Sequence, residues 1–247
     1  MPLISAHRGG CGVDGLAARE RYRRAIELGV DFVEFDVRRS LDEVMVVCHD
    51  PCTASGRAVC ELEYGALAEE LAGEALTLAE LLEIAGGKVG LHLDLKEPGY
   101  EAAVVEAALA HCPLERLVIT SEDSVVKTIK ERWPRVRAGL SLGEDLHGIR
   151  PWVAAGTRLS ELFPARRLRA CGADFVAVHQ RLAGLNVLRY CERVGIPAWV
   201  WTVDEEPDIA RFMKDSRVAT LITNRPDVAL RVRQRGDPRA SDQPTTT

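Results

Sequence analysis

The feature that most constrains the fold is a regular alternation of short apolar runs with helical patterns along the whole chain. Apolar runs that predict strands occupy residues 3–6, 31–37, 88–96, 116–121, 136–142, 174–179, 198–203 and 218–223. Helical patterns stand between them, for example at residues 17–28, 100–111 and 185–194, and an interrupted one at residues 159–171. Thr77, with Glu80 three residues on, predicts the capping box of a helix that runs to residue 84. A strand, a helix and a second strand in this order form a right-handed parallel crossover. Eight such strands, with no composition break that divides the chain, predict an α/β protein with a (β/α)₈ barrel.

Two segments depart from the alternation. An additional strand is predicted at residues 44–48, and residues 52–75 follow it with weak periodicity, which indicates an insertion with one short helix. We therefore expect one barrel domain over residues 1–236, with this insertion after the His49 strand. The polar, proline-containing residues 237–247 predict a disordered tail.

A doubly wound open sheet is the alternative fold. Gly10, Gly12 and Gly15 match the spacing of a dinucleotide-binding loop, and Glu34 follows at a suitable distance. This pattern explains nothing after Asp36, so the barrel is the better interpretation.

Composition excludes several functional classes. The net charge is −5 and no basic face is visible in the order of residues, so a nucleic-acid partner is disfavoured. No apolar run is long enough for a membrane span, and no secretory signal is visible. The seven cysteines lack paired spacing, which indicates reduced thiols in a cytoplasmic protein. Cys48, Cys52 and Cys60 with His49 do not have the spacing of a usual zinc module.

The strand at residues 31–37 carries two carboxylates on one face. Phe32, Glu34 and Asp36 are two residues apart, so their side chains point the same way. No Lys or Arg lies within the strand, and the pair is costly unless a cation lies between them or one carboxylate stays protonated. Oxygen ligands suit Mg²⁺ or Ca²⁺. The alternative is a strand end whose acids face solvent.

Other polar residues stand at the carboxyl ends of predicted strands, which converge on one mouth in a barrel. These residues are His7, Arg8, His49, Asp94, Lys96 and Trp201. Together with the two carboxylates they suit metal-assisted cleavage of a phosphodiester. The acids would hold a metal that polarises a phosphoryl oxygen, the cations would neutralise phosphate charge, and the two histidines would serve as base and acid.

These motifs, in this order, resemble those of the glycerophosphodiester phosphodiesterase family. His7-Arg8-Gly9, Glu34-x-Asp36 and His49-Asp50 resemble its HRG…ExD…HD pattern, and residues 76–82, 92–96, 201–204 and 221–226 resemble its later motifs. The resemblance implies a TIM barrel that hydrolyses a glycerophosphodiester to glycerol 3-phosphate and an alcohol, an activity of lipid and glycerol metabolism. It also implies one divalent cation, Mg²⁺ or Ca²⁺, with Mn²⁺ as a further candidate.

The resemblance implies a role for each of these positions. Glu34, Asp36 and Asp94 would hold the metal, His7 and His49 would be the acid–base pair, Arg8 and Lys96 would bind phosphate, and Trp201 would line the pocket. In the family the substrate's own glycerol hydroxyl can attack phosphorus first, giving a cyclic phosphate that water then opens.

The chain departs from the family pattern at three places. Residues 16–18 read Leu-Ala-Ala where the family usually has Glu-Asn-Thr, Asp94 stands for the usual Glu, and Asn224 stands for the usual Asp. The first departure bears on the substrate more than on the chemistry.

Two other functions stay open. A phospholipase D-like lyase on lysophospholipids would release a cyclic phosphate and would need an apolar rim, for which the insertion offers Leu62, Tyr64, Leu67 and Leu71. A non-catalytic phosphate- or sugar-binding barrel would have no need of two histidines at acid–base positions. In each case the partner is a small molecule.

Three further side chains have a structural interpretation beside a functional one. His92 either supports Asp94 or packs inside the barrel, and His179 ends a strand and is a candidate for the mouth. Trp199 is expected to pack one layer deeper than Trp201.

Overall fold

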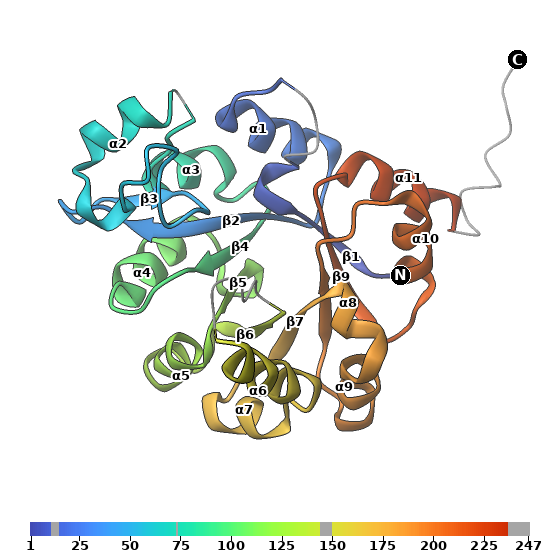
Figure 1. Cartoon of the computed structure of the whole chain (residues 1–247). Coiled ribbons are helices and arrows are strands. Elements are labelled where there is room, and N and C mark those ends of the chain that lie inside the picture. Colours follow the sequence, from blue (N-terminus) through green and yellow to red (C-terminus); the bar gives the residue numbers. More distant parts are fainter. Residues whose placement is uncertain (11–14, 73, 144–149, 237–247) are drawn as a thin grey trace, which may run out of the picture.

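The computed structural model describes residues 1–10, 15–72, 74–143 and 150–236, whose sheet is a closed barrel (Figure 1). Its parallel strands follow one another as β1 (Leu3–Ala6), β2 (Phe32–Arg39), β4 (Gly90–Leu95), β5 (Leu117–Ser121), β6 (Arg137–Leu142), β7 (Phe175–His179), β8 (Ala198–Trp201) and β9 (Val218–Thr223). Strand β1 pairs with both β2 and β9, which closes the barrel. The predicted (β/α)₈ barrel is confirmed, and the doubly wound alternative is wrong.

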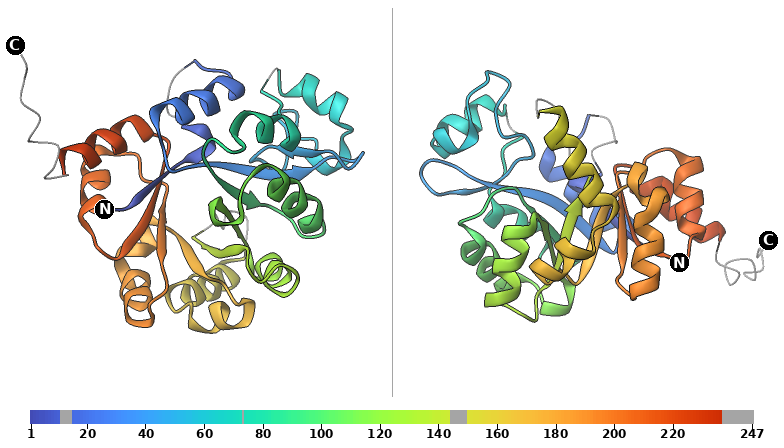
Figure 2. Two further views of the ribbon diagram at one scale, coloured as in Figure 1. Left: turned by 180° about the vertical axis from the view of Figure 1, so that it is seen from behind. Right: turned by 60° about the horizontal axis from the view of Figure 1, so that its bottom comes forward.

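Helices surround the barrel on its outside (Figures 1 and 2). They include α1 (Ala18–Leu28), α3 (Leu78–Ala85), α4 (Glu101–His111), α5 (Asp123–Arg132), α6 (Pro151–Leu162), α7 (Ala165–Cys171), α8 (Gln180–Leu182), the π-helix η4 (Ala183–Val187), α9 (Leu188–Val194), α10 (Glu206–Lys214) and α11 (Pro226–Arg235). None of the helices in the described ranges combines the length and apolar character needed to cross a bilayer.

Local sequence determines where these helices begin. Helix α3 starts at a capping box, because the Thr77 hydroxyl accepts from Glu80 N and the Glu80 carboxylate accepts from Thr77 N. Helices α10 and α11 each have a proline in the first turn, where no backbone donor is lost. The capping box is as predicted.

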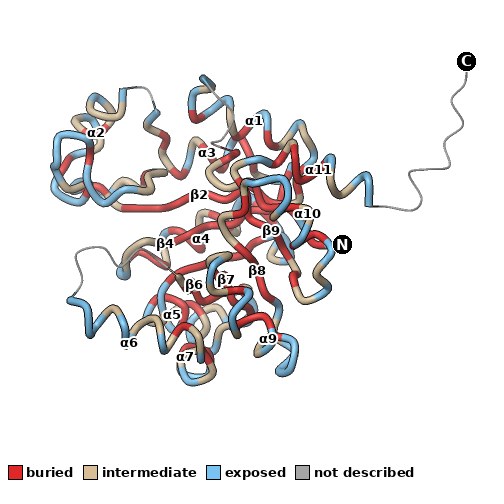
Figure 3. The backbone as a smooth tube through the Cα atoms, turned by 45° about the vertical axis from the view of Figure 1, so that its right-hand side comes forward, coloured by how far each residue is buried: buried red, intermediate tan, exposed pale blue. Residues whose placement is uncertain are grey.

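Alternating strand residues separate the inside of the barrel from its outer layer. Val33, Phe35 and Val37 of β2 pack in the layer between strands and helices, where they are fully buried. Strand β2 is buried along nearly its whole length (Figure 3). Phe32, on the other face of β2, packs inside the barrel with a Trp199 ring whose centroid is 5.3 Å away. Trp199 therefore occupies the inner layer, as expected. The polar residues Glu34 and Asp36 continue the Phe32 face toward the mouth.

The inner layer requires a residue without a side chain at Gly139 on β6. A Cβ atom there would lie 2.3 Å from the Phe175 ring. Phe175 in turn stacks on Trp199 at 4.7 Å between centroids. Glycine at this position thus makes room for the aromatic residues that fill the barrel below the mouth.

The insertion forms a small core of its own. Strand β3 (Met45–Val47) pairs antiparallel with the end of β2, and η2 (Val59–Glu61) and α2 (Tyr64–Glu70) follow. Leu62 and Leu67 are buried there against Val46 and Val59, with Tyr64 and Leu71 at the edge of the cluster. Two of the four residues expected to form an apolar rim are therefore occupied in internal packing, and that expectation is wrong for Leu62 and Leu67.

Other differences concern helix boundaries. One interrupted helical region was predicted at residues 159–171, whereas α6 already begins at Pro151 and Pro164 separates it from α7. The helix predicted at residues 185–194 is preceded by α8 and begins as the π-helix η4. The predicted tail at 237–247 lies outside the described residues.

Candidate active site

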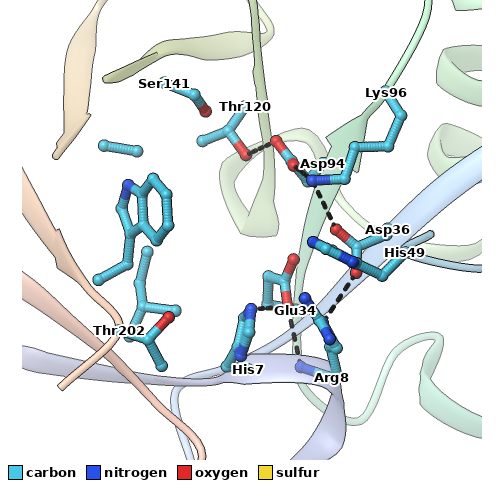
Figure 4. A pocket seen from close by; sticks show the side chains of 13 residues that line it. His7, Arg8, Glu34, Asp36, His49, Asp94, Lys96, Thr120, Ser141 and Thr202 are labelled. Carbon is cyan, nitrogen blue, oxygen red and sulfur yellow. Dashed lines mark hydrogen bonds and ion pairs between the residues drawn. The ribbon is translucent and has the colours of Figure 1, made fainter. Parts of the chain in front are cut away.

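The carboxyl ends of the strands surround one cavity of about 490 Å³ (Figure 4). All eight side chains singled out in the sequence line it: His7, Arg8, Glu34, Asp36, His49, Asp94, Lys96 and Trp201. Thr120, Ser141 and Thr202 line it too, and sequence reasoning missed them. The cavity thus combines two imidazoles, three carboxylates and two cations.

Three buried carboxylates lie close together in this cavity. Glu34, Asp36 and Asp94 are buried, and one oxygen of each lies within 4.8 Å of the others. Asp36 and Asp94 are partners in the β2–β4 register, which places them side by side. Buried oxygen ligands at this spacing are the donor set that a hard divalent cation prefers. The group therefore fits a resident metal ion.

Charge in the cluster is unevenly distributed. Burial raises the pKa of Glu34, and the neighbouring Asp36 and Asp94 raise it further. Burial would also raise the pKa of Asp36, but Lys96 and Arg8 outweigh it and hold that pKa below its ordinary value. Lys96 Nζ lies 2.9 Å from Asp36 Oδ1 and also pairs with Asp94. Without a metal, Lys96 is thus the main counter-ion of the two aspartates.

Arg8 contacts the cluster through both its backbone and its side chain. Its backbone adopts the left-handed region at φ 49°, and its N–H donates to Glu34 Oε2 at 2.8 Å. Its Nε lies 3.1 Å from Asp36 Oδ2, but this buried N–H has no aligned acceptor among the described residues. A buried guanidinium donor of this kind is suited to an oxygen atom of a bound anion. Gly9 follows at φ 70°, where a Cβ would lie 2.9 Å from the Tyr22 ring.

A chain of hydrogen bonds inside the barrel holds Asp94. The Thr120 hydroxyl donates to Asp94 Oδ1 at 2.7 Å, so it must accept from His92 Nε2, which lies 3.0 Å away. His92 Nδ1 then accepts from the Ser5 hydroxyl at 3.1 Å. Burial lowers the pKa of His92 to about 3, so the ring is neutral in this chain. His92 therefore both supports Asp94 through Thr120 and packs edge-on against Trp199.

The His49 side chain is held from its Nδ1 side. Nδ1 lies 2.7 Å from Asp50 Oδ1, which leaves Nε2 free to face the cavity. The guanidinium of Arg38 donates twice to the His49 carbonyl, at 2.9 and 2.8 Å, and fixes the backbone. Burial lowers the pKa of His49, which favours its neutral form near pH 7.

Other candidate residues lie elsewhere. The His179 ring packs edge-on against Trp201 at 5.1 Å and does not line the cavity. Cys48, Cys52 and Cys60 do not join any group of potential metal ligands within the described part of the chain. Cys11 and Gly12 lie outside it.

Comparison with known proteins gives this geometry a context. Residues 18–132 match the model of the Glycerophosphoryl diester phosphodiesterase family. The chain is 27% identical to a glycerophosphodiester phosphodiesterase from Caldanaerobacter subterraneus subsp. tengcongensis, over 95% of this chain and 98% of that protein. The chain is thus similar to the glycerophosphodiester phosphodiesterase family, both in the matched segment and over nearly its whole length.

Solved structures of this family share the fold. A glycerophosphodiester phosphodiesterase from Parabacteroides distasonis superposes with a TM-score of 0.75 at 22% identity, covering 96% of this chain and 98% of that one. An Oleispira antarctica phosphodiesterase, solved in complex with the product sn-glycerol-3-phosphate, superposes with a TM-score of 0.73 at 19% identity, covering 94% and 96%.

The structure gives a physical reason for Asn224, which stands for an Asp of the glycerophosphodiester phosphodiesterase pattern. Its backbone N and its Nδ2 both donate to Asp204, each at 2.8 Å. Its Oδ1 faces His7 Nδ1 at 2.7 Å, so it accepts from that nitrogen. An amide can donate to one partner and accept from the other, whereas an aspartate here would face the Asp204 carboxylate. Asp204 and Asn224 thus fix the His7 ring, with Nε2 3.9 Å from Glu34 Oε2.

The structure also shows the surroundings of the other two departures from the family pattern, at Asp94 and at residues 16–18. Asp94, at the place of the usual Glu, is held by the Thr120 hydroxyl of β5. At residues 16–18 no polar side chain takes the place of Glu-Asn-Thr, and α1 begins without a side-chain cap at Ala17.

Proposed function

We propose that this chain, a phosphoric diester hydrolase by family, hydrolyses a glycerophosphodiester to glycerol 3-phosphate and an alcohol. The observation that carries the proposal is the single cavity in which a three-carboxylate cluster lies beside two cations and two imidazoles. The product complex of the Oleispira antarctica phosphodiesterase supports the substrate class. The proposal takes residues 1–236 as one catalytic domain.

In this proposal Glu34, Asp36 and Asp94 hold one divalent cation. When bound, such an ion polarises a phosphoryl oxygen. Arg8 and Lys96 bind the remaining phosphate oxygens, and the buried Nε of Arg8 has a donor to offer them. The two cations thereby stabilise the negative charge of the transition state.

The two histidines divide the proton transfers. His49 is the base, because its lowered pKa keeps Nε2 unprotonated near neutral pH. It takes the proton from the attacking hydroxyl, either water or the glycerol hydroxyl of the substrate. The bond from that oxygen to phosphorus forms while the bond to the alcohol oxygen breaks. Where the glycerol hydroxyl attacks, the product is a cyclic phosphate, and water opens it to glycerol 3-phosphate in a second step. His7, whose ring is fixed by Asn224, donates a proton to the departing alcohol.

The test is hydrolysis of glycerophosphocholine and glycerophosphoethanolamine by metal-stripped protein, with Mg²⁺, Mn²⁺ or Ca²⁺ added back. Glu34→Ala and His49→Ala should each abolish the metal-stimulated release of glycerol 3-phosphate. Glu83→Ala and His111→Ala are matched controls on exposed helix positions and should leave it unchanged. Metal binding without turnover on either diester would refute the proposal and favour a binding barrel, and a stable cyclic product would favour the lyase.

A further inference from the structure

Helix α6 exposes large apolar side chains to solvent instead of packing them against the barrel. Trp152, Leu159 and Phe163 are 69%, 60% and 61% exposed, and Val153 is 47% exposed. At 100° per residue the first three fall on one stripe of the helix surface. Glu161, on the opposite side, is buried and accepts from Gly143 N at 2.9 Å. The helix is therefore anchored by its polar side and presents its apolar side to solvent.

A neighbouring segment extends this apolar stripe. The Asn186 side chain donates to the Leu162 carbonyl at 2.7 Å, which fixes the end of α6 against η4. Leu185, next to Asn186, is 62% exposed. We call Trp152, Val153, Leu159, Phe163 and Leu185 the α6 face. Of the nine large apolar residues exposed within the described ranges, these five lie in one part of the molecule, and such clustering marks an interaction site.

The surroundings of the α6 face are cationic. Residues 150–190 contain seven arginines and two acids, although the whole chain has a net charge of −5. Both acids are engaged, Glu161 with Arg158 and Asp174 with Lys130. By contrast, several arginines of this stretch are exposed and have no ion-pair partner among the described residues: Arg150, Arg166, Arg181 and Arg189.

These arginines lie close to the apolar residues. The Arg150 guanidinium is 5.8 Å from the centre of the Trp152 ring. Arg166 follows Phe163 by three residues, and Arg181 and Arg189 stand four residues before and after Leu185 in a continuous helical segment. Aromatic and aliphatic side chains bordered by arginines are the composition of a surface that binds anionic lipid.

The α6 face also lies beside the mouth of the barrel. Thr157 and Glu161, on the inner side of α6, line a second cavity together with His49, Asp94 and Lys96 of the candidate active site. Figures 2 and 3 show α6 at the edge of the barrel, and Figure 3 shows that most of its residues are exposed or intermediate. A surface bound to the α6 face would thus hold the mouth close to it.

We propose that the α6 face docks this protein on an anionic lipid bilayer. The apolar side chains enter the interfacial region and the arginines contact lipid phosphates. A second copy of the chain fits less well, because an isologous contact would bring the same unpaired arginines of both copies together. The docking goes beyond the proposed hydrolysis and does not depend on it.

The test is co-sedimentation of the full chain with vesicles of phosphatidylcholine alone or mixed with phosphatidylglycerol. We expect binding to the anionic vesicles that weakens as salt rises. Trp152→Ser with Phe163→Ser should weaken it by at least about tenfold, because both apolar anchors are lost. Arg166→Gln with Arg181→Gln should weaken it about tenfold or more and flatten its salt dependence.

The control variant is Leu3→Ser with Val194→Ser, which removes two exposed apolar side chains outside the α6 face and should bind as the parent protein does. Equal binding by the parent and the Trp152/Phe163 variant, or no binding to anionic vesicles, would overturn the proposal. So would a dimer, seen by light scattering, that this variant dissociates. Vesicle binding needs no turnover, so a failure to hydrolyse glycerophosphocholine would leave the docking result readable.

Discussion

Replacing Thr120 with valine tests the hydrogen-bond chain that holds Asp94. Valine has nearly the same shape, so no cavity forms, but the bonds of 2.7 Å to Asp94 and 3.0 Å to His92 are both lost. The first is a bond to a carboxylate, which contributes about 1.5–3 kcal/mol, and the second leaves a buried ring nitrogen without a partner at a cost of about 1–3 kcal/mol. Allowing for partial relaxation, we expect the free energy of unfolding to fall by about 3 kcal/mol.

In a chain of this length that loss corresponds to a melting temperature lower by about 6–12 °C. Circular dichroism on metal-stripped protein measures it without interference from ligand binding. Thr128→Val is the matched control, because its hydroxyl bonds only to a carbonyl within its own helix. It should change stability by less than about 0.5 kcal/mol.

The same substitution should weaken metal affinity by about 10–100-fold, because Thr120 orients a candidate ligand. Isothermal titration with the activating ion measures this effect. If Thr120→Val melts with the parent protein and binds metal equally well, the Ser5–His92–Thr120–Asp94 chain has neither the structural nor the orienting role assigned to it.

Three further predictions test His7, the carboxylate cluster and the packing around α9. Asn224→Leu removes the acceptor of His7 Nδ1, so steady-state kinetics should show kcat lowered by about 10–100-fold with little change in KM. A change in KM alone would contradict a positioning role for Asn224. Lys96→Met removes the main counter-ion of the buried Asp36 and Asp94 and should lower the free energy of unfolding by about 3–5 kcal/mol. Added divalent metal should restore much of this loss in a thermal melt. A melt insensitive to metal would refute the three-carboxylate site. Burial raises the pKa of Cys191 to about 11, so this thiol should stay protonated at pH 8. Iodoacetamide at pH 8 should therefore label exposed Cys52 and spare Cys191 until the chain unfolds, as measured by peptide mass spectrometry. Equal labelling of the two cysteines would contradict the packing around α9.

Most of the cavity lining could be predicted because strand periodicity and barrel geometry determine it. Glu34 and Asp36 share a face on any strand, and the carboxyl ends of parallel strands meet at one mouth. The supporting residues could not be predicted in the same way. A single Thr at position 120 has no distinctive pattern, and only the register that pairs it with Asp94 shows its role. Asp204 is likewise explained only by its two bonds to Asn224.

The start of α6 was missed for a related physical reason. Helical periodicity in a sequence usually indicates a face buried against the core. In α6 the apolar stripe of Trp152 and Leu159 faces solvent and the buried side carries Glu161, so the usual interpretation does not apply. The insertion shows the opposite case, since Leu62 and Leu67 were expected at the surface and are buried.

The pairing of β1 with β9 joins the two ends of the chain and has a consequence for biosynthesis. His7 receives its hydrogen-bond partner from Asn224, 217 positions later in the sequence. A nascent or C-terminally shortened chain that lacks β9 would leave the edges of β1 and β8 unpaired, which invites association with other strands. The arrangement around His7 can therefore assemble only after β9 and Asn224 have left the ribosome. Enzymatic turnover would then report directly that the barrel has closed.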